Sequence, residues 1–116
     1  MNIAEQIRLK LQLKENSEVE FKSAKGGFPK AEFWRSFSAL ANTNGGTIVL
    51  GVKEKNHEFI PDGLSAEQIS KYRKQFWDDA HNKSCINIPL LVESDIEEIR
   101  TEGEQYLLAF RVPRAQ

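Results

Sequence analysis

The sequence contains one cysteine and only two histidines among its 116 residues. The thiol of Cys85 has no second cysteine with which to form an internal disulfide bond. Together with His57 and His81 it also makes no cluster with the ligand spacing of a zinc site. A disulfide scaffold and a structural zinc site are therefore excluded.

Long apolar runs are also missing. The first eight residues lack the apolar core of a signal peptide. No run approaches the roughly 18 to 20 residues that a membrane-spanning helix needs. The content of 40% hydrophobic and 28% charged residues is typical of a soluble globular protein. We therefore expect a cytoplasmic protein without a membrane partner, folded as a single domain over residues 1–116.

The sequence has no excess of positive charge, since its formal net charge is −1. This balance argues against a dedicated nucleic-acid binder, because phosphate neutralisation normally leaves a basic excess. The charges are unevenly distributed, however. Basic residues recur over 14–35 and 71–74, whereas acidic residues concentrate over 93–104. Two interpretations stay open, a basic face for a polyanion and an ordinary solvated surface.

Hydrophobic periodicity predicts three helices, over residues 2–13, 30–42 and 65–81. The third helix should begin at a capping box formed by Ser65 and Gln68. Alternating or continuous apolar runs predict strands in the remaining parts of the chain. These strands are expected at 17–22, 47–52, 59–60, 90–100 and 105–112.

The interleaved helices and strands predict an α/β (α+β) fold, with a mixed central sheet of about four to six strands packed with about three helices. Residues 47–52 should form a central strand that is covered on both faces. Residues 53–58 are expected to form a turn, and the last two strands a hairpin with edge character. Trp34 and Trp77 lie on apolar helix faces, so we expect them to pack inward instead of stacking on unpaired bases.

A polar turn with two adjacent glycines joins the second helix to the central strand. Asn42, Thr43 and Asn44 can hydrogen-bond to their own backbone, and Gly45 and Gly46 permit a sharp reversal. A plain helix-to-strand connection and a phosphate-contacting loop are both open interpretations. A nucleotide-binding P-loop is not, because these glycines close a helix instead of opening one.

Three segments of the chain resemble the Schlafen-type AlbA-like domain (Schlafen AlbA_2), the DNA-binding module of bacterial regulators that also occurs in Schlafen proteins. These segments are residues 15–22, with Glu20-Phe21-Lys22, residues 39–52, with the Asn-Thr-Asn-Gly-Gly run, and Val112-Pro113-Arg114. The resemblance implies a mixed α/β fold and a role in nucleic-acid binding. It further implies the N-terminal domain of a longer protein, either a transcriptional regulator or a defence-type protein.

Some Schlafen proteins use the same fold as a metal-dependent endoribonuclease with three carboxylates. The resemblance places this trio at Glu15, Glu20 and Glu54. The family often has aspartate at the third position, and Lys53 precedes Glu54 here. Carboxylate oxygens suit Mg²⁺ or Mn²⁺, and they would meet only if the two strands that carry them are neighbours. The alternative is that Glu18 and Glu20 are solvent-facing strand residues paired with lysines.

Binding without catalysis would use basic side chains and the polar turn to contact the phosphates of DNA or of a structured RNA. The residues predicted for this role are Lys22, Lys25, Lys30, Arg35, Asn42, Thr43, Asn44, Gly45 and Gly46. Two alternatives remain: a Mg²⁺- or Mn²⁺-dependent endoribonuclease, and a protein-interaction module that forms a homodimer through an edge strand.

Overall fold

The computed structural model describes residues 3–13, 17–82, 95–101 and 103–114, and within them the chain forms three helices and six strands. The helices are α1 (Ile3–Lys10), α2 (Lys30–Ala41) and α3 (Ala66–His81). The strands are β1 (Val19–Lys22), β2 (Gly46–Leu50), β3 (Val52–Lys55), β4 (Glu58–Pro61), β5 (Ile96–Arg100) and β6 (Tyr106–Val112).

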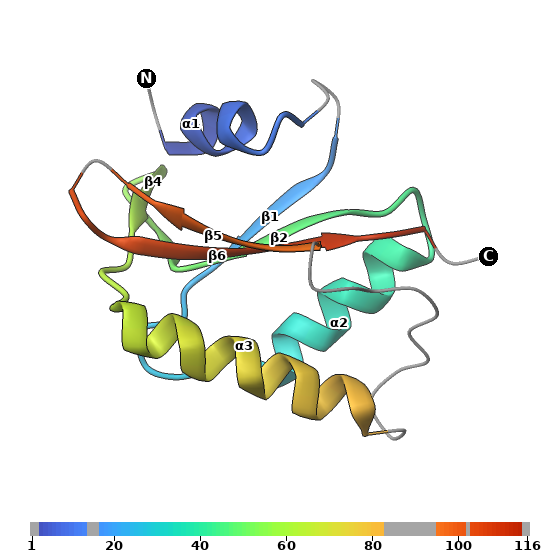
Figure 1. Cartoon of the computed structure of the whole chain (residues 1–116). Coiled ribbons are helices and arrows are strands. Elements are labelled where there is room, and N and C mark those ends of the chain that lie inside the picture. Colours follow the sequence, from blue (N-terminus) through green and yellow to red (C-terminus); the bar gives the residue numbers. More distant parts are fainter. Residues whose placement is uncertain (1–2, 14–16, 83–94, 102, 115–116) are drawn as a thin grey trace.

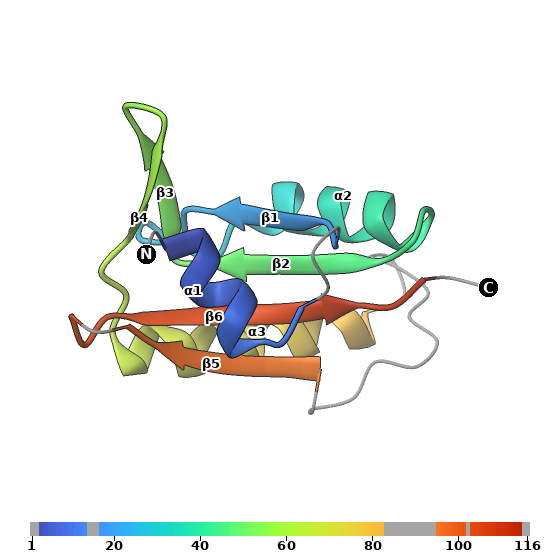
Figure 2. The same ribbon diagram turned by 90° about the horizontal axis from the view of Figure 1, so that it is seen from above.

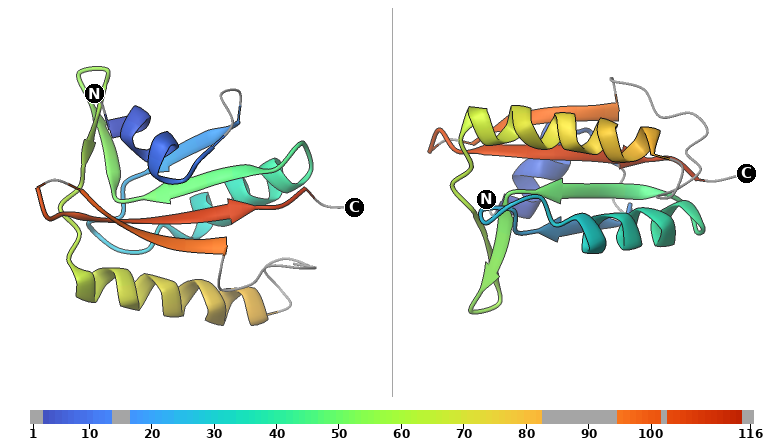
Figure 3. Two further views of the ribbon diagram at one scale, coloured as in Figure 1. Left: turned by 45° about the horizontal axis from the view of Figure 1, so that its top comes forward. Right: turned by 90° about the horizontal axis from the view of Figure 1, so that it is seen from below.

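The main sheet has helices on both faces (Figure 1). Its strand order is β1-β2-β6-β5, with β1 parallel to β2 and the other neighbours antiparallel. α1 lies on one face, and α2 and α3 lie side by side on the other, as the two views of Figure 3 show. This arrangement confirms the predicted α/β (α+β) fold with a mixed central sheet.

The predicted central strand is confirmed as β2, which lies between β1 and β6, but it ends at Leu50, and Val52 begins β3 of the separate two-stranded sheet. Ile48 and Leu50 are fully buried in the cluster that α2 and α3 cover, and Val49 is fully buried in the cluster that α1 covers. A strand that is covered on both faces has no solvent-facing position. This explains why its residues form a continuous apolar run instead of alternating with polar ones.

The expectation that both final strands are edges is wrong for β6. This strand lies between β2 and β5, and the four consecutive residues Leu107–Phe110 are buried. The chain passes from β5 at the edge back into the middle of the sheet, so only β5 has edge character among the strands of this hairpin. Formation of a homodimer through this edge stays a prediction.

The turn expected at residues 53–58 is instead most of a second hairpin, in which β3 pairs with β4. The reversal itself takes only Asn56 and His57, whose φ angles are +53° and +66°. Two successive positive φ angles are typical of the type I′ turn that suits a two-residue hairpin. The hairpin projects away from the main sheet, as Figure 2 shows.

The two tryptophans pack inward, as predicted. Trp34 is 8% exposed, and its ring stacks on Phe76 with the centroids 5.3 Å apart. Trp77 is partly buried against the same cluster and meets Phe76 edge to face. Stacking on unpaired bases is therefore not the role of Trp34.

The start of α3 also follows the sequence prediction. Ser65 Oγ accepts a hydrogen bond from the backbone N–H of Gln68 at 3.2 Å, and Gln68 Oε1 accepts one from the backbone N–H of Ser65 at 3.0 Å. The predicted metal ligand Glu15 and the first residues of the strand predicted at 90–100 lie outside the described residues.

Candidate functional site

Seven of the nine residues predicted to contact nucleic acid lie toward the two ends of α2, whereas Arg35 lies in the middle of this helix and Lys22 lies on β1. Lys25 and Lys30 are near its N-terminal end, and residues 43–46 follow its C-terminal end. A 12-residue helix is about 18 Å long. The two groups therefore lie apart, and each borders its own cleft.

The cleft at the N-terminal end of α2, here called the lysine cleft, has a volume of about 450 Å³. Three ammonium-bearing side chains border it, those of Lys25, Lys30 and Lys71. The other residues of its described lining are Gly26, Gly27, Phe28, Gln68, Tyr72 and Gln75. This described lining includes no carboxylate, so the cleft is suited to an anion. Lys71, which lies on α3, was not among the predicted contact residues.

The loop that carries Lys25 is fixed by one buried carboxylate. Asp62 is 4% exposed, and its Oδ2 accepts hydrogen bonds from Ser23 Oγ at 2.8 Å, from the N–H of Ala24 at 2.7 Å and from the N–H of Lys25 at 2.9 Å. The hydroxyl of Tyr72 donates to the carbonyl of Ala24. The wall of the cleft is therefore held by α3 and by the residue that follows β4.

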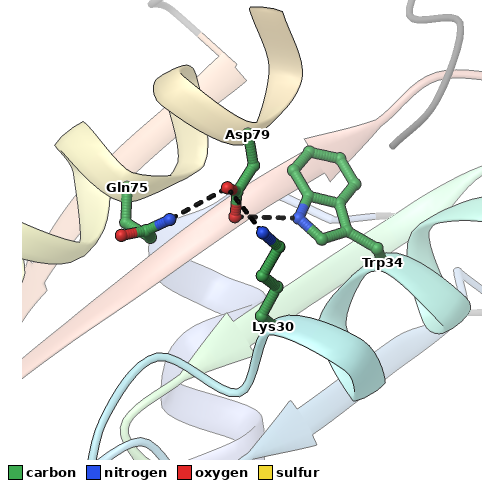
Figure 4. A network of polar contacts seen from close by, with 4 residues as sticks. All are labelled: Lys30, Trp34, Gln75 and Asp79. Atoms are coloured by element: carbon green, nitrogen blue, oxygen red, sulfur yellow. Dashed lines mark hydrogen bonds and ion pairs between the residues drawn. The ribbon is translucent and has the colours of Figure 1, made fainter. Parts of the chain in front are cut away.

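Lys30 belongs to a polar network with Trp34, Gln75 and Asp79 (Figure 4), and Lys30 and Gln75 of this network also line the cleft. Lys30 Nζ lies 3.3 Å from Oδ1 of Asp79, which is 4% exposed. Asp79 also accepts hydrogen bonds from Gln75 Nε2 at 2.9 Å and from Trp34 Nε1 at 3.3 Å. Because 56% of the Lys30 side chain remains exposed, Lys30 both compensates a buried charge and faces the cleft. Asp79 was missed, although a carboxylate three residues after Phe76 on the inner side of a helix was a signal.

The cleft at the C-terminal end of α2, here called the glutamate cleft, has a volume of about 840 Å³ and is bordered by Glu18, Glu20 and Arg111 together with residues 43–47. The polar turn supplies hydrogen-bond donors to the C-terminal end of α2. The carbonyl of Leu40 accepts hydrogen bonds from the N–H of Gly45 at 2.8 Å, from the N–H of Thr43 at 3.1 Å and from the Thr43 hydroxyl at 3.0 Å. These donors cap α2, as a plain helix-to-strand connection requires.

The family model described as Schlafen, AlbA_2 matches residues 15–116. The chain belongs to this family. The match confirms the resemblance that the Glu-Phe-Lys strand and the glycine-paired turn indicated, and it begins after α1.

A solved structure that is similar to this Schlafen AlbA_2 domain is the solution NMR structure of the N-terminal domain of a RecG-related protein from Nitrosomonas europaea. The two share 18% sequence identity with a TM-score of 0.63, and the match covers 100% of this chain and 75% of that chain. At this identity the likeness supports the fold. The search of curated proteins finds no match. Among the described residues, no helix is both long enough and apolar enough to cross a membrane.

The structure gives two of the three predicted metal ligands of this Schlafen AlbA_2 domain, Glu20 and Glu54, different surroundings. Glu20 borders the glutamate cleft together with Glu18, and its Oε1 lies 3.9 Å from Lys22 Nζ. Glu54 is exposed on β3, in the projecting hairpin, and Glu15 lies outside the described residues. Within the described part of the chain, no group of three His, Cys, Asp or Glu side chains is placed to hold a metal ion.

Three of the residues predicted to contact nucleic acid border neither the lysine cleft nor the glutamate cleft. Lys22 pairs with Glu20 and has only 15% of its side chain exposed. Arg35 is exposed on α2, and Asn42 is the exposed residue that ends this helix. The structure thus brings Lys25 and Lys30 together with Lys71, and Thr43, Asn44, Gly45 and Gly46 together with Glu18, Glu20 and Arg111.

Proposed function

We propose that this Schlafen AlbA_2 domain binds nucleic acid and that the lysine cleft contacts its phosphates. The observation that carries the proposal is the convergence of Lys25, Lys30 and Lys71 on one cleft whose described lining has no carboxylate. Lysine ammonium groups bind phosphate as compact point charges. The glutamate cleft suits phosphate less well, because two carboxylates and the negative end of the α2 dipole lie there.

The partner that we propose is DNA, with structured RNA as the alternative, and the setting is a bacterial regulator or defence-type protein. Membership of the Schlafen AlbA_2 family supports this partner class. The similar domain from Nitrosomonas europaea supports it further, since that protein is described as related to the ATP-dependent DNA helicase RecG.

Fluorescence anisotropy of labelled duplex DNA, single-stranded DNA and structured RNA across a salt series tests the proposal. We expect binding whose log K falls linearly with log salt. The double variant Lys25→Gln/Lys71→Gln should make that slope shallower by about 1 for each phosphate that the protein no longer neutralises. The matched double variant Lys53→Gln/Lys55→Gln removes two exposed lysines from β3 and should leave the slope nearly unchanged.

Two results would count against the proposal in different ways. The absence of binding to all three probes at low salt would contradict nucleic-acid binding by this domain. Binding with equal slopes for both double variants would contradict the lysine cleft as the contact surface.

A second candidate function is metal-dependent endoribonuclease activity, in which Glu20 would hold Mg²⁺ or Mn²⁺. The observation that favours it is that Glu18 and Glu20 border a cleft large enough for an RNA strand segment, with Arg111 beside them. Hard divalent cations prefer carboxylate oxygens, and a bound ion can activate water for attack on phosphorus. Glu15 is the second ligand that we propose for this site, whereas Glu54, the third predicted ligand, lies on the projecting hairpin and is not part of the described lining of this cleft.

For this second candidate we expect Glu20→Gln to abolish cleavage of a structured RNA in Mn²⁺ while leaving RNA binding unchanged or tighter. Removal of a carboxylate lowers the affinity for the cation without adding repulsion toward phosphate. Glu58→Gln, an exposed change on β4, is the matched control and should cleave like the unaltered protein. Gel analysis of end-labelled RNA with EDTA, Mg²⁺ and Mn²⁺ provides the measurement. The absence of cleavage by the unaltered protein with either metal would contradict endoribonuclease activity.

A further inference from the structure

We infer that the lysine cleft takes one nucleotide, with its phosphate among the three lysines and its base beside Phe28. This inference rests on the proposed function and makes it more specific. The cleft has a volume of about 450 Å³, within the range of small-molecule sites and suited to a single nucleotide unit. A site of this size fits a strand end or an unpaired nucleotide better than a continuous duplex, which presents many phosphates over a long surface.

The charge of the cleft matches a phosphate group. Lys25 comes from the loop before α2, Lys30 from the first turn of α2, and Lys71 from α3. Among the described residues, neither Lys25 nor Lys71 forms an ion pair, and Lys30 pairs with the buried carboxylate of Asp79, which is not part of the described lining of the cleft. Within the part of the chain that the structure describes, two lysines thus lack a counter-charge at one concave site. A phosphate with one or two negative charges would supply it.

The apolar part of the lining is suited to a planar ring. Phe28 is partly buried, with its ring centroid 5.2 Å from that of Phe33 and 6.0 Å from that of Tyr72, so its position is fixed from two sides. Stacking of a base on an aromatic ring stabilises binding and tolerates every base. Phe28 is therefore the aromatic residue that we assign to the base.

The glutamines of the cleft are already engaged. Gln68 Nε2 donates to the carbonyl of Lys25 at 3.3 Å, and Gln75 Nε2 donates to Asp79 at 2.9 Å. Each bond uses one N–H of the amide and fixes that amide to the wall of the cleft, so neither side chain turns freely to follow the edge of each base. We therefore expect the four common nucleoside monophosphates to bind with affinities within about threefold of one another, since stacking discriminates weakly between bases.

Trp34 provides a reporter for an occupied cleft. A phosphate bound to Lys30 competes with Asp79 for the same ammonium group, and Asp79 also accepts the indole N–H of Trp34. The indole proton resonance of Trp34 should therefore shift on binding. Trp77 is the internal reference, since its buried Nε1 has no hydrogen-bond partner within the described part of the chain and is not joined to this network.

The test is an NMR titration of the ¹⁵N-labelled protein with adenosine monophosphate, inorganic phosphate and adenosine. We expect adenosine monophosphate to shift the Trp34 indole resonance and the amide resonances of Gly26 and Gly27. Lys71→Gln should weaken its binding roughly tenfold, as for removal of one charge-assisted hydrogen bond. Lys74→Gln is the matched control on the same helix. Lys74 pairs with Asp78 at 2.8 Å and does not border the cleft, so affinity should not change.

Each other outcome overturns the inference in a recognisable way. Equal affinity for inorganic phosphate and adenosine monophosphate would show that the cleft does not bind the base. Equal affinity for adenosine and its monophosphate would show that the lysines do not bind the phosphate. Retained oligonucleotide binding without any shift from the mononucleotide would reject the single-nucleotide site and leave the proposed function standing. Loss of binding to both kinds of probe would reject both.

Discussion

Replacing Gly45 by alanine is expected to lower the free energy of unfolding by about 3 kcal/mol or more. Gly45 has a φ of +78°, which L side chains rarely adopt. A Cβ atom there would lie 2.5 Å from the carbonyl oxygen of Val112 and 3.1 Å from the backbone nitrogen of Arg114. Backbone atoms cannot rotate aside as a side chain can. The end of β6 would therefore have to shift away from the start of β2.

Gly26→Ala is the matched control for this prediction. A Cβ on Gly26 would meet no heavy atom within 4 Å. The expected change is within about 0.5 kcal/mol, because only the entropy of the unfolded chain is altered appreciably. Urea unfolding followed by tryptophan fluorescence gives both values. Similar stabilities for the two variants would show that the turn tolerates a side chain and that the close approach of β6 is relaxed in solution.

The close approach of β6 to Gly45 gives a structural reason for the glycine in the polar turn. Two adjacent glycines after a helix left open both a phosphate-contacting loop and a plain connection. The close approach of Val112 and Arg114 is a sufficient reason for glycine at this position. In addition, the backbone N–H of Gly45 already donates a hydrogen bond to the carbonyl of Leu40. Weaker nucleic-acid binding by Gly45→Ala would therefore have to be corrected for the unfolded fraction before a phosphate is assigned to the turn.

The parts of the fold that depend on local patterns could be predicted from the sequence. The periodicity of residues 30–42 and the capping box at Ser65 and Gln68 describe interactions within a few residues of each other. Strand order is not local. The position of β6 between β2 and β5 depends on which distant strands pair, and a sequence of one protein contains no direct signal for this choice. The continuous apolar run of residues 107–110 was the available indication in the sequence.

The hairpin formed by β3 and β4 escaped prediction for a different reason. Residues 53–58 are all exposed, so they show no alternation of apolar and polar residues. The usual sequence signal for a type I′ turn is Asn-Gly or Asp-Gly, whereas this turn uses Asn56 and His57. A histidine with positive φ is uncommon enough that the turn could not be placed at this dipeptide from the sequence.

Of the candidate site, only the residues that lie close together in the sequence were predicted. Lys25 and Lys30 are close in the chain, so their association with one end of α2 could be expected. Lys71 and Asp79 lie on α3. Only the side-by-side packing of α2 and α3 brings Lys71 to the cleft that Lys25 and Lys30 border, and Asp79 to the network that includes Lys30. The clustering of charge along the sequence indicated a basic surface, and tertiary packing determined which lysines share it.

Replacing Asp62 by alanine is the second change for which we expect a large effect, a loss of about 3 kcal/mol in the free energy of unfolding. One buried carboxylate oxygen accepts three hydrogen bonds, two of them from the backbone N–H groups of Ala24 and Lys25. Its removal leaves these donors without a partner, and each buried donor without a partner costs about 1–3 kcal/mol. Asp78→Ala is the matched control. Asp78 is exposed and pairs with Lys74, so the loss should stay below about 1 kcal/mol.

Asp62→Asn separates the stability of the fold from the geometry of the lysine cleft. The amide oxygen keeps the shape of the side chain and can still accept hydrogen bonds, but without the negative charge it holds the N–H groups of Ala24 and Lys25 less strongly. We expect a fold that remains largely native and a weaker affinity for adenosine monophosphate, although no lysine has changed. Chemical denaturation together with the NMR titration measures both effects. Unchanged affinity in this variant would mean that Lys25 contributes its charge to the cleft without needing the fixed loop beneath it.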